Sequence, residues 1–483
     1  MRTAVALALC ALSGLPGWAA AEAPSEALAE IEASISGAAQ RHWSDALQIW
    51  AWAEPGYQET RSSALLASRL EEAGFQVERG VAGMPTAFVA SFGEGAPVIG
   101  VLAEFDALPG FSQQAAPTPR PREGQTWGHA CGHHLFGVGS VAAAIAVADA
   151  IRARALGGTV RLYGTPAEEG GGAKTFMVRD GLFAGVDAVL HWHCDDRNVA
   201  GDPTNQARIA AKFRFHGTSA HAAAAPEEGR SALDAVDVMN YAAELLREHT
   251  PDLTRIHRVI TAGGLAPNVV PDFAEVYYYV RHPDPRVAEE VYARLVKCAE
   301  AGALATGTEL EIEHLGGVSS ILPNDTLAEL SLRTLTELND LSYTAEERGF
   351  ALELQETLGK PLPLDTLSQV LDRRGETETG STDVGDVSWV VPTTGVSVAC
   401  WVPGTPAHSW QAVAAGGTTI GRQGMLLAAR TLAATAAELM SDPQVLARAK
   451  EELDRRVGET PYRPMLEPGQ EPPLDYRDPP KGR

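Results

Sequence analysis

The sequence predicts an α/β protein built on a doubly wound, mostly parallel sheet, with a smaller domain inserted into it. Apolar, strand-like runs alternate with helix-like segments over the first two hundred residues. Several of these runs end in acids or histidines, as expected where strands open onto a binding edge. Between residues 205 and 318 a self-contained order of strands and helices predicts a second, ferredoxin-like domain.

Length and charge limit the classes of partner. At 483 residues the chain is longer than one hydrophobic core usually supports, so we expect more than one domain. Apolar residues make up 45% of the chain and charged residues 21%, as in ordinary globular proteins. Because the formal net charge is −23, we expect neither nucleic acid nor an anionic membrane as a partner.

The first residues predict export. Residues 1–21 combine a basic residue, an apolar run and small residues at a cleavage position, the pattern of a secretory signal. No later stretch is expected to span a bilayer, so we expect a soluble protein exported to a bacterial periplasm. The cysteines beyond this signal are too sparse for a disulfide framework. Those expected to be buried rather than paired are Cys194, Cys298 and Cys400.

Residues 22–204 are expected to form the first part of the catalytic domain. Helical spacing of apolar residues predicts helices over 27–52, 62–73, 135–155 and 173–182. Strands are predicted over 75–78, 86–91, 96–109, 158–164 and 186–193. The last three runs are apolar enough for parallel strands buried on both faces, and residues 111–126 form a polar loop.

The inserted domain and the rest of the chain follow in order. Within 205–318 we expect strands over 208–216, 258–262, 275–281 and 309–314, with helices over 231–249 and 284–302. The catalytic domain resumes over 319–458, with helices predicted at 345–358, 420–440 and 445–457 and strands at 388–391 and 396–402. Residues 359–382 form a loop-rich insert. Residues 459–483 contain seven prolines and predict an extended or disordered tail.

The segment 128–134 is the strongest chemical signal in the chain. Its seven residues include three histidines and one cysteine, the side chains that zinc and its neighbours bind best. Cys131 and His133 lie two residues apart, so a locally extended backbone directs both the same way. The alternative is a loop whose polar residues cap the following helix.

Further metal-type residues follow two other strands. Glu168 and Glu169 come after one buried strand, and His191 and His193 end the next. With His408 and one residue from each pair, the chain offers five candidate ligands, which suits two ions that share a bridge. One carboxylate would bind metal and the other would act as general base on a water molecule.

Other assignments remain open from the residues alone. Glu104 and Asp106 either orient a ligand imidazole or cap the next turn. Cys131 could instead be the nucleophile of a thiol hydrolase, with a nearby histidine as base. A non-catalytic binding protein on the same fold is the third hypothesis, because fold does not determine function.

Six motifs run through nearly the whole chain beyond residue 21. They begin at Gly128 (GHACGH), Gly164 (GTPAEEGG), Phe215 (FHGTSAHA), Pro267 (PNVVPD), Gly380 (GSTDVGDVSW) and Gly404 (GTPAHSW). With them the sequence resembles the dinuclear metallo-amidohydrolases, which include aminoacylases, glutamate carboxypeptidases and hydrolases of indole-acetyl-amino acids. Within this family it is most similar to the hydrolases of p-aminobenzoyl-glutamate.

The resemblance implies a metal-dependent amidohydrolase that cleaves N-acyl or N-aroyl amino acids such as p-aminobenzoyl-glutamate. It implies Glu168 as the general base that acts on a metal-activated water. It implies two divalent ions, zinc or manganese. The residues implied to hold them are Cys131, His133, Glu169, His193 and His408.

The resemblance also assigns roles to the inserted domain, which is implied to form a homodimer. His221 is implied to reach the partner's active site and stabilise the tetrahedral oxyanion. Asn268 and Arg281 are implied to contact the substrate. Arg281 is implied to bind the carboxylate of the substrate through its guanidinium. Many relatives have aspartate where this chain has His134, so the identity of the metal stays open. Substrate choice stays open too, because residues 111–126 and 359–382 are expected to border the cleft.

Overall fold

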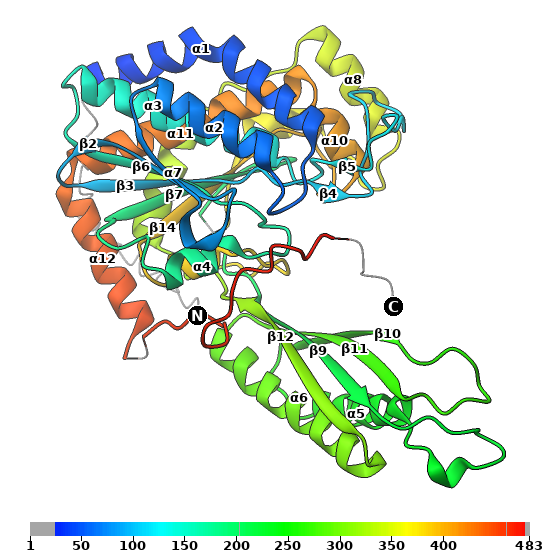
Figure 1. The fold of residues 1–483 in the computed structure, drawn as a ribbon. Coiled ribbons are helices and arrows are strands. Elements are labelled where there is room, and N and C mark those ends of the chain that lie inside the picture. The colour runs from blue at the N-terminus through cyan, green and yellow to red at the C-terminus, as the bar shows by residue number, and fades with distance from the viewer. Residues whose placement is uncertain (1–24, 202, 460, 479–483) are drawn as a thin grey trace, which may run out of the picture.

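The structure is a computed structural model that describes residues 25–201, 203–459 and 461–478, so the predicted secretory signal lies outside the described residues. Figure 1 shows a large α/β body from which a smaller arm extends. Among the described residues the larger sheet has the strand order β1-β2-β6-β3-β7-β14-β8-β13, and the arm has the order β10-β11-β9-β12. This arrangement confirms the predicted α/β fold class.

The centre of the large sheet is parallel. β3 (Val98–Ala103), β6 (Gly158–Gly164), β7 (Ala188–Asp195) and β14 (Thr393–Ala399) pair in parallel and are mostly buried. Their carboxyl ends therefore meet at one edge of the sheet, which is where the site lies. The remaining strands of this sheet are β1 (Gln76–Arg79), β2 (Phe88–Glu94), β8 (Asn198–Ala200) and β13 (Val370–Asp372), and β4 (Leu108–Pro109) pairs with β5 (Trp127–Gly128).

Helix α3 (His133–Arg152) is the core helix of the body. It packs on β3, β6 and β7 and is covered by α1 (Ser25–Trp52) and α11 (Thr419–Ser441). Its length and hydropathy are those of a membrane span, which corrects the expectation that no such stretch exists, yet 89% of its apolar window is buried. The packing is close, because a Cβ at Gly139 would come within 2.9 Å of the Trp192 ring.

The other helices surround this core. Figure 1 places α2 with α1 above the sheet and α4 below it. Their bounds are α2 (Thr60–Glu72), α4 (Ala173–Arg179), α7 (Asp325–Leu338), α8 (Ala345–Gln355), α9 (Val384–Ser388), α10 (Trp410–Gly416) and α12 (Pro443–Val457).

The strand predicted over 388–391 is wrong. Helix α9 occupies Val384–Ser388, a turn comes next, and the following strand begins only at Thr393. The buried valines Val384, Val387 and Val391 are spaced three and four residues apart, which places them on one side of a helical turn. The β-branched valines predicted a strand. The segment is instead a short helix and a turn, because this arrangement buries these valines on one side.

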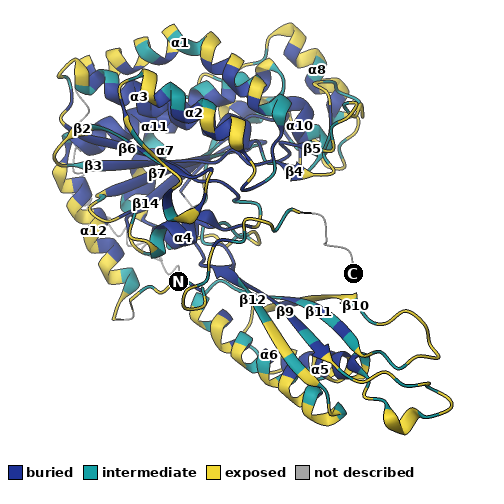
Figure 2. Cartoon of the chain, viewed as in Figure 1, coloured by how far each residue is buried: buried dark blue, intermediate teal, exposed yellow. Residues whose placement is uncertain are grey.

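The arm has its own hydrophobic core. Alternate residues of β11, from Ala274 to Val280, are buried against the two helices, while much of the opposite side is open to solvent (Figure 2). Ser231 and Asp284 accept hydrogen bonds as the N-caps of those helices. The elements are β9 (Ala207–His216), α5 (Ala232–Arg247), β10 (Arg255–Ala262), β11 (Phe273–His282), α6 (Pro285–Thr306) and β12 (Glu309–Val318).

The Pro-rich tail is packed against the body. Residues 461–478 contain no helix or strand, and in Figure 1 this segment runs between the body and the arm. The Tyr462 hydroxyl donates to Asp386 at 2.6 Å, and the Tyr476 ring meets Tyr57 edge to face at 5.7 Å. Arg477 donates to the carbonyl oxygen of Glu169 at 2.6 Å. Aromatic and guanidinium side chains thus attach the tail to the body, whereas its prolines predicted only an extended or disordered segment.

We predict that Tyr476→Ala lowers the free energy of unfolding by about 2 kcal/mol, because it removes a packed aromatic pair. Leu474→Ala on the same segment is the matched control, since Leu474 is 39% exposed, and it should change stability by less than about 0.5 kcal/mol. Urea unfolding followed by circular dichroism measures both. Equal stability of the two variants would show that the tail is not held by this contact.

Candidate active site

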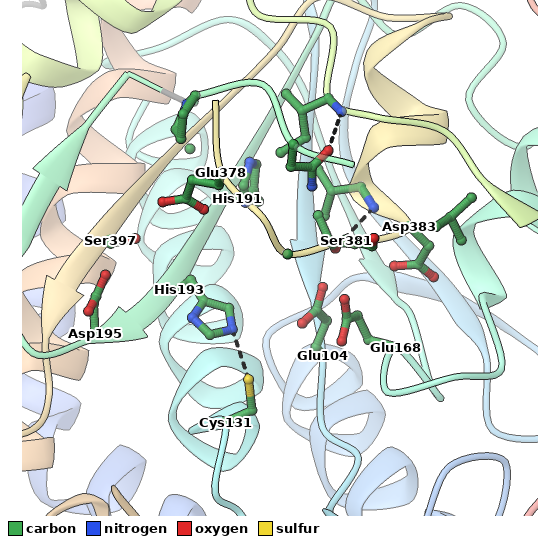
Figure 3. Close-up of a pocket in the computed structure, with 18 of the residues that line it drawn as sticks. Glu104, Cys131, Glu168, His191, His193, Asp195, Glu378, Ser381, Asp383 and Ser397 are labelled. Atoms are coloured by element: carbon green, nitrogen blue, oxygen red, sulfur yellow. Dashed lines mark hydrogen bonds between the residues drawn. The ribbon is translucent and has the colours of Figure 1, made fainter. Parts of the chain in front are cut away.

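A cavity of about 480 Å³ opens at the carboxyl edge of the large sheet (Figure 3). Side chains of the body and of the arm line it together, so the site lies where the two parts meet. The insert 359–382 borders the cavity through residues from Arg373 to Thr382, as expected, whereas the loop 111–126 is not among the lining residues. The predicted site residues that line it are Cys131, Glu168, Glu169, His193, Arg281 and His408.

Gly132 shapes the loop that carries Cys131 and His133. Its φ of 77° lies in the left-handed region, and it forms the N-cap of α3. A Cβ at this position would lie 2.5 Å from the sulfur of Cys194, so only glycine fits. The turn leaves His133 at the start of the helix, fully buried, and brings Cys131 Sγ to 3.3 Å from His193 Nε2.

Asp106 orients His133, which decides the alternative left open by the sequence. Asp106 Oδ1 lies 2.9 Å from His133 Nδ1, and its Oδ2 accepts the backbone N–H of Glu169 at 3.0 Å. His133 Nε2 then faces Glu104 Oε2 at 3.2 Å. A carboxylate that accepts from one ring nitrogen directs the other nitrogen toward a ligand, so Asp106 is not a simple cap.

The turn that carries the two adjacent acids is held from both sides. Ala167 has a φ of 55°, unusual for a residue with a Cβ, and its N–H donates to buried Glu59 at 2.9 Å. The two acids face different groups. Glu169 Oε1 lies 3.1 Å from His408 Nε2, whereas Figure 3 shows Glu168 beside Glu104.

The chain brings its predicted ligands together in groups whose candidate ligand atoms lie within 4.8 Å of one another. The groups among the described residues are Cys131 with His133 and His193, Cys131 with Glu169 and His408, and Glu104 with His133 and Glu168. Cys131 and His133 each belong to two groups, so the three groups form one continuous cluster, which suits more than one ion. His191 lines the cavity but joins none of these groups, so His193 is the better placed histidine of that strand.

The donor set fits divalent cations. Among the described residues, His133 Nε2 and Glu169 Oε1 are buried and make no well-aligned hydrogen bond, although Glu104 and His408 lie 3.2 and 3.1 Å from them. Buried polar atoms normally have a partner, so both atoms suit metal coordination. Thiolate, imidazole and carboxylate together favour zinc or a similar transition metal over magnesium or calcium.

Burial governs the protonation of the site. It raises the pKa of the Cys131 thiol well above its usual range, and the nearby Glu169 adds to this effect. It also raises the pKa of Glu168, with Glu104 and Glu169 contributing as like charges. Burial, helped by His133, lowers the pKa of His193 to about 4, so this imidazole stays neutral at pH 7 and keeps a lone pair.

The sequence did not reveal Lys174 and Asp383, which form a buried ion cluster with Glu104 beside the candidate ligands. Lys174 is fully buried, and its Nζ lies 2.7 Å from Glu104 Oε1 and 2.5 Å from Asp383 Oδ1. Its backbone N–H also donates to Asp383 at 3.0 Å. A lysine directly after Gly-Gly-Gly-Ala and before an apolar stretch was the available signal, and Asp383 stands inside the motif that begins at Gly380.

Three of the predicted site residues do not line this cavity: His133, which is fully buried beside Cys131 and His193, and His221 and Asn268 on the arm. His221 and Asn268 are exposed on the arm. The backbone of His221 forms an antiparallel β-bridge with Val269, and the N–H of Ala222 donates to the carbonyl oxygen of Asn268 at 3.0 Å. Neither lines the cavity of its own chain, whereas Arg281 does. The cavity of this chain is therefore built without His221 and Asn268.

Residues 100–469 match the family described as peptidase family M20/M25/M40. The chain belongs to this family. Over 463 residues this M20 peptidase is 42% identical to a subunit of the p-aminobenzoyl-glutamate hydrolase of Escherichia coli K12, an alignment that covers 89% of this chain and 96% of the relative. It is 31% identical over 441 residues to a mouse Xaa-Arg dipeptidase, covering 88% and 91%. These relatives are hydrolases of amide bonds, and the chain is an amidohydrolase of the same family.

Solved structures share the fold of this M20 peptidase. An aminobenzoyl-glutamate utilization protein from Klebsiella pneumoniae matches with a TM-score of 0.61 at 17% identity, covering 85% of this chain and 98% of that one. A dinuclear metal binding peptidase of the M20 family from Bacillus subtilis matches with a TM-score of 0.58 at 18% identity, covering 84% and 99%. Both likenesses confirm the architecture of a catalytic domain with an inserted arm.

We predict that Lys174→Met lowers the free energy of unfolding by about 3–5 kcal/mol, because it leaves Glu104 and Asp383 buried without their cation. Lys212→Met is the control, since Lys212 is partly exposed and lies 3.9 Å from Glu313, and it should cost less than about 1 kcal/mol. Chemical denaturation measures both. A loss below about 1 kcal/mol for Lys174→Met would contradict the described role of this ion cluster.

Proposed function

We propose that this chain is a metal-dependent amidohydrolase that cleaves N-acyl or N-aroyl amino acids of the p-aminobenzoyl-glutamate kind. The observation that carries the proposal is the convergence of Cys131, Glu169, His193 and His408 on one cavity, which Glu168 also lines. His133 is buried directly beside Cys131 and His193. These residues come from segments far apart in the chain. Two divalent cations, zinc or manganese, would be held by Cys131, His133, Glu169, His193 and His408.

Glu168 is the general base of the proposed reaction. When bound, the cations supply Lewis acidity that polarises the amide carbonyl and makes a nearby water molecule more acidic. Glu168 stands apart from the Glu169–His408 pair, so its carboxylate is available to take a proton from the attacking water. It then returns this proton to the leaving nitrogen.

The geometry disfavours a thiol hydrolase. His193 Nε2 lies 3.3 Å from Cys131 Sγ, within reach for a base, but burial holds the pKa of this thiol well above its usual range. Without a cation the reactive thiolate is therefore scarce. Cys131 is better suited to metal binding than to attack on the substrate.

The substrate assignment rests on the E. coli relative, which is named for p-aminobenzoyl-glutamate and matches nearly its whole length. Arg281 would bind the carboxylate of the amino acid, since it lines the cavity and carries a planar guanidinium. Export to a bacterial periplasm is part of the proposal and rests on the composition of residues 1–21.

The proposal includes a homodimer formed through the arm. The outer side of α5 presents Val238, Tyr241 and Leu245 at helical spacing, and Tyr241 is 70% exposed. The neighbouring β10 is an edge strand that presents Val259 and Ile260 to solvent. Pairing of two arms here would bring the arm of one copy near the body of the other. His221 would then stabilise the oxyanion in the partner's cavity, with Asn268 contacting the substrate.

We predict that Glu168→Gln lowers turnover of N-aroyl amino acids by about 10²–10⁴-fold while the bound metal is retained. Hydrolysis assays with added zinc or manganese, together with metal analysis, measure both quantities. Glu123→Gln is the control, because Glu123 is exposed on the loop 111–126.

Loss of metal from a folded Glu168→Gln variant would make Glu168 a ligand and would contradict its role as base. Treatment of the wild-type protein with a chelator should abolish activity, and added metal should restore it. Activity that survives complete metal removal would favour the thiol mechanism.

We predict that His221→Ala abolishes most activity without loss of metal, and that mixing it with a Cys131→Ala variant restores activity. Restoration is expected because a mixed dimer contains one cavity with both an intact metal cluster and an intact His221. Subunit exchange followed by assay measures it. No restoration in dimers shown to be mixed would contradict a shared site, and a chain that pairs only with a different protein would contradict the homodimer.

A further inference from the structure

Two arginines of the arm face the cavity as a cross-strand pair. Arg208 of β9 and Arg281 of β11 are directly opposite each other in the antiparallel register. Directly opposed side chains lie on the same face of a sheet, with Cβ atoms about 5 Å apart. Both side chains line the cavity that holds the metal-type cluster. Both guanidiniums lie over the ring of Tyr279, at 5.1 and 5.6 Å from its centroid.

Neither guanidinium is neutralised within the described residues. No carboxylate of that part of the chain lies within 4.0 Å of Arg208 or Arg281, and both Nε atoms are buried without a hydrogen-bond partner. Arg281 Nη1 donates a hydrogen bond to the Ser381 hydroxyl at 3.3 Å. Burial lowers the pKa of Arg281, and Arg208 adds to this effect as a like charge. A chain of net charge −23 thus leaves two adjacent cations without an acid.

The third arginine of the same cavity behaves differently. Arg373 pairs with Glu376 at 2.7 Å and also with Glu378, so its charge is already balanced. Among the acids on the opposite wall, Asp383 and Glu104 share the ammonium of Lys174. The uncompensated positive charge therefore belongs to the pair Arg208–Arg281 and is aimed at a ligand.

We propose that Arg208 binds a second carboxylate of the substrate, so that the cavity selects amides whose leaving amino acid is acidic. The inference rests on the proposed function, in which Arg281 takes the α-carboxylate. An acidic side chain of two or three carbons carries its own carboxylate within reach of the adjacent guanidinium. A planar guanidinium binds such a group through two parallel hydrogen bonds. A basic leaving residue would meet two unneutralised cations and would be repelled.

The test compares p-aminobenzoyl-glutamate with p-aminobenzoyl-glutamine, which has the same shape without the second charge. For the wild-type full chain we expect kcat/KM to favour glutamate by at least about tenfold. In Arg208→Met this preference should fall by roughly 10- to 100-fold, mainly through KM of the glutamate substrate. Arg208→Lys, which keeps the charge but loses the planar fork, should give an intermediate preference.

Arg197→Met is the control, because Arg197 does not line the cavity and already pairs with Asp196 at 3.1 Å, and it should leave the preference unchanged. Two results would overturn the inference: a wild-type chain that cleaves both substrates equally, or an Arg208→Met variant that loses both activities by the same factor. The second result would mean that both arginines hold the α-carboxylate.

Failure of the proposed function would look different, because neither amide would then be cleaved. Calorimetric titration of the wild-type chain and of Arg208→Met with glutarate and with its monoamide decides the matter without turnover. Tighter binding of glutarate that depends on Arg208 supports the second-carboxylate site. Equal binding of the two compounds contradicts it.

Discussion

The site depends on one buried carboxylate. Asp106 stands just after β3 and uses one oxygen to orient His133 at the start of α3 and the other to hold the backbone of Glu169 after β6. It therefore joins three segments that the chain supplies separately. Because a buried carboxylate is costly unless its oxygens are hydrogen bonded, these two contacts also explain why the three segments keep a common geometry.

The cavity is electrically divided. Its acidic side gathers Glu104, Glu168 and Glu169 around the thiol and imidazoles, and the ammonium of Lys174 offsets only part of this charge. Its basic side is the pair Arg208–Arg281 on the arm. Cations suit the first side and the anionic part of a substrate suits the second. In the proposed reaction the amide bond would lie at the cluster while the arginine pair held the carboxylates of the substrate, so a strongly acidic protein could still take an anionic ligand.

Much of the fold was predictable because most elements carry a clear period. The parallel strands are apolar runs that end in acids or histidines, and the order of the arm is a complete unit. Prediction failed where local composition and tertiary context disagree. The valine-rich stretch at 388–391 is the end of a helix and a turn, since the buried valines of this region share one face. The tail looked free because prolines dominate it, yet Tyr476 and Arg477 attach it beside the acidic turn.

The amino-acid order alone established which chemistry is available: a cysteine and a histidine two residues apart, adjacent acids after a strand, and a histidine in a distant loop. These are local spacings, and they survive any arrangement of the elements. Only the tertiary structure decided between Asp106 as an orienting group and a cap, since that depends on a contact across 27 residues. It alone revealed the burial of Lys174 and the opposition of Arg208 and Arg281. Both features arise from strand register and packing, which bring together residues that are far apart in the sequence. The local sequence around each residue does not predict such contacts.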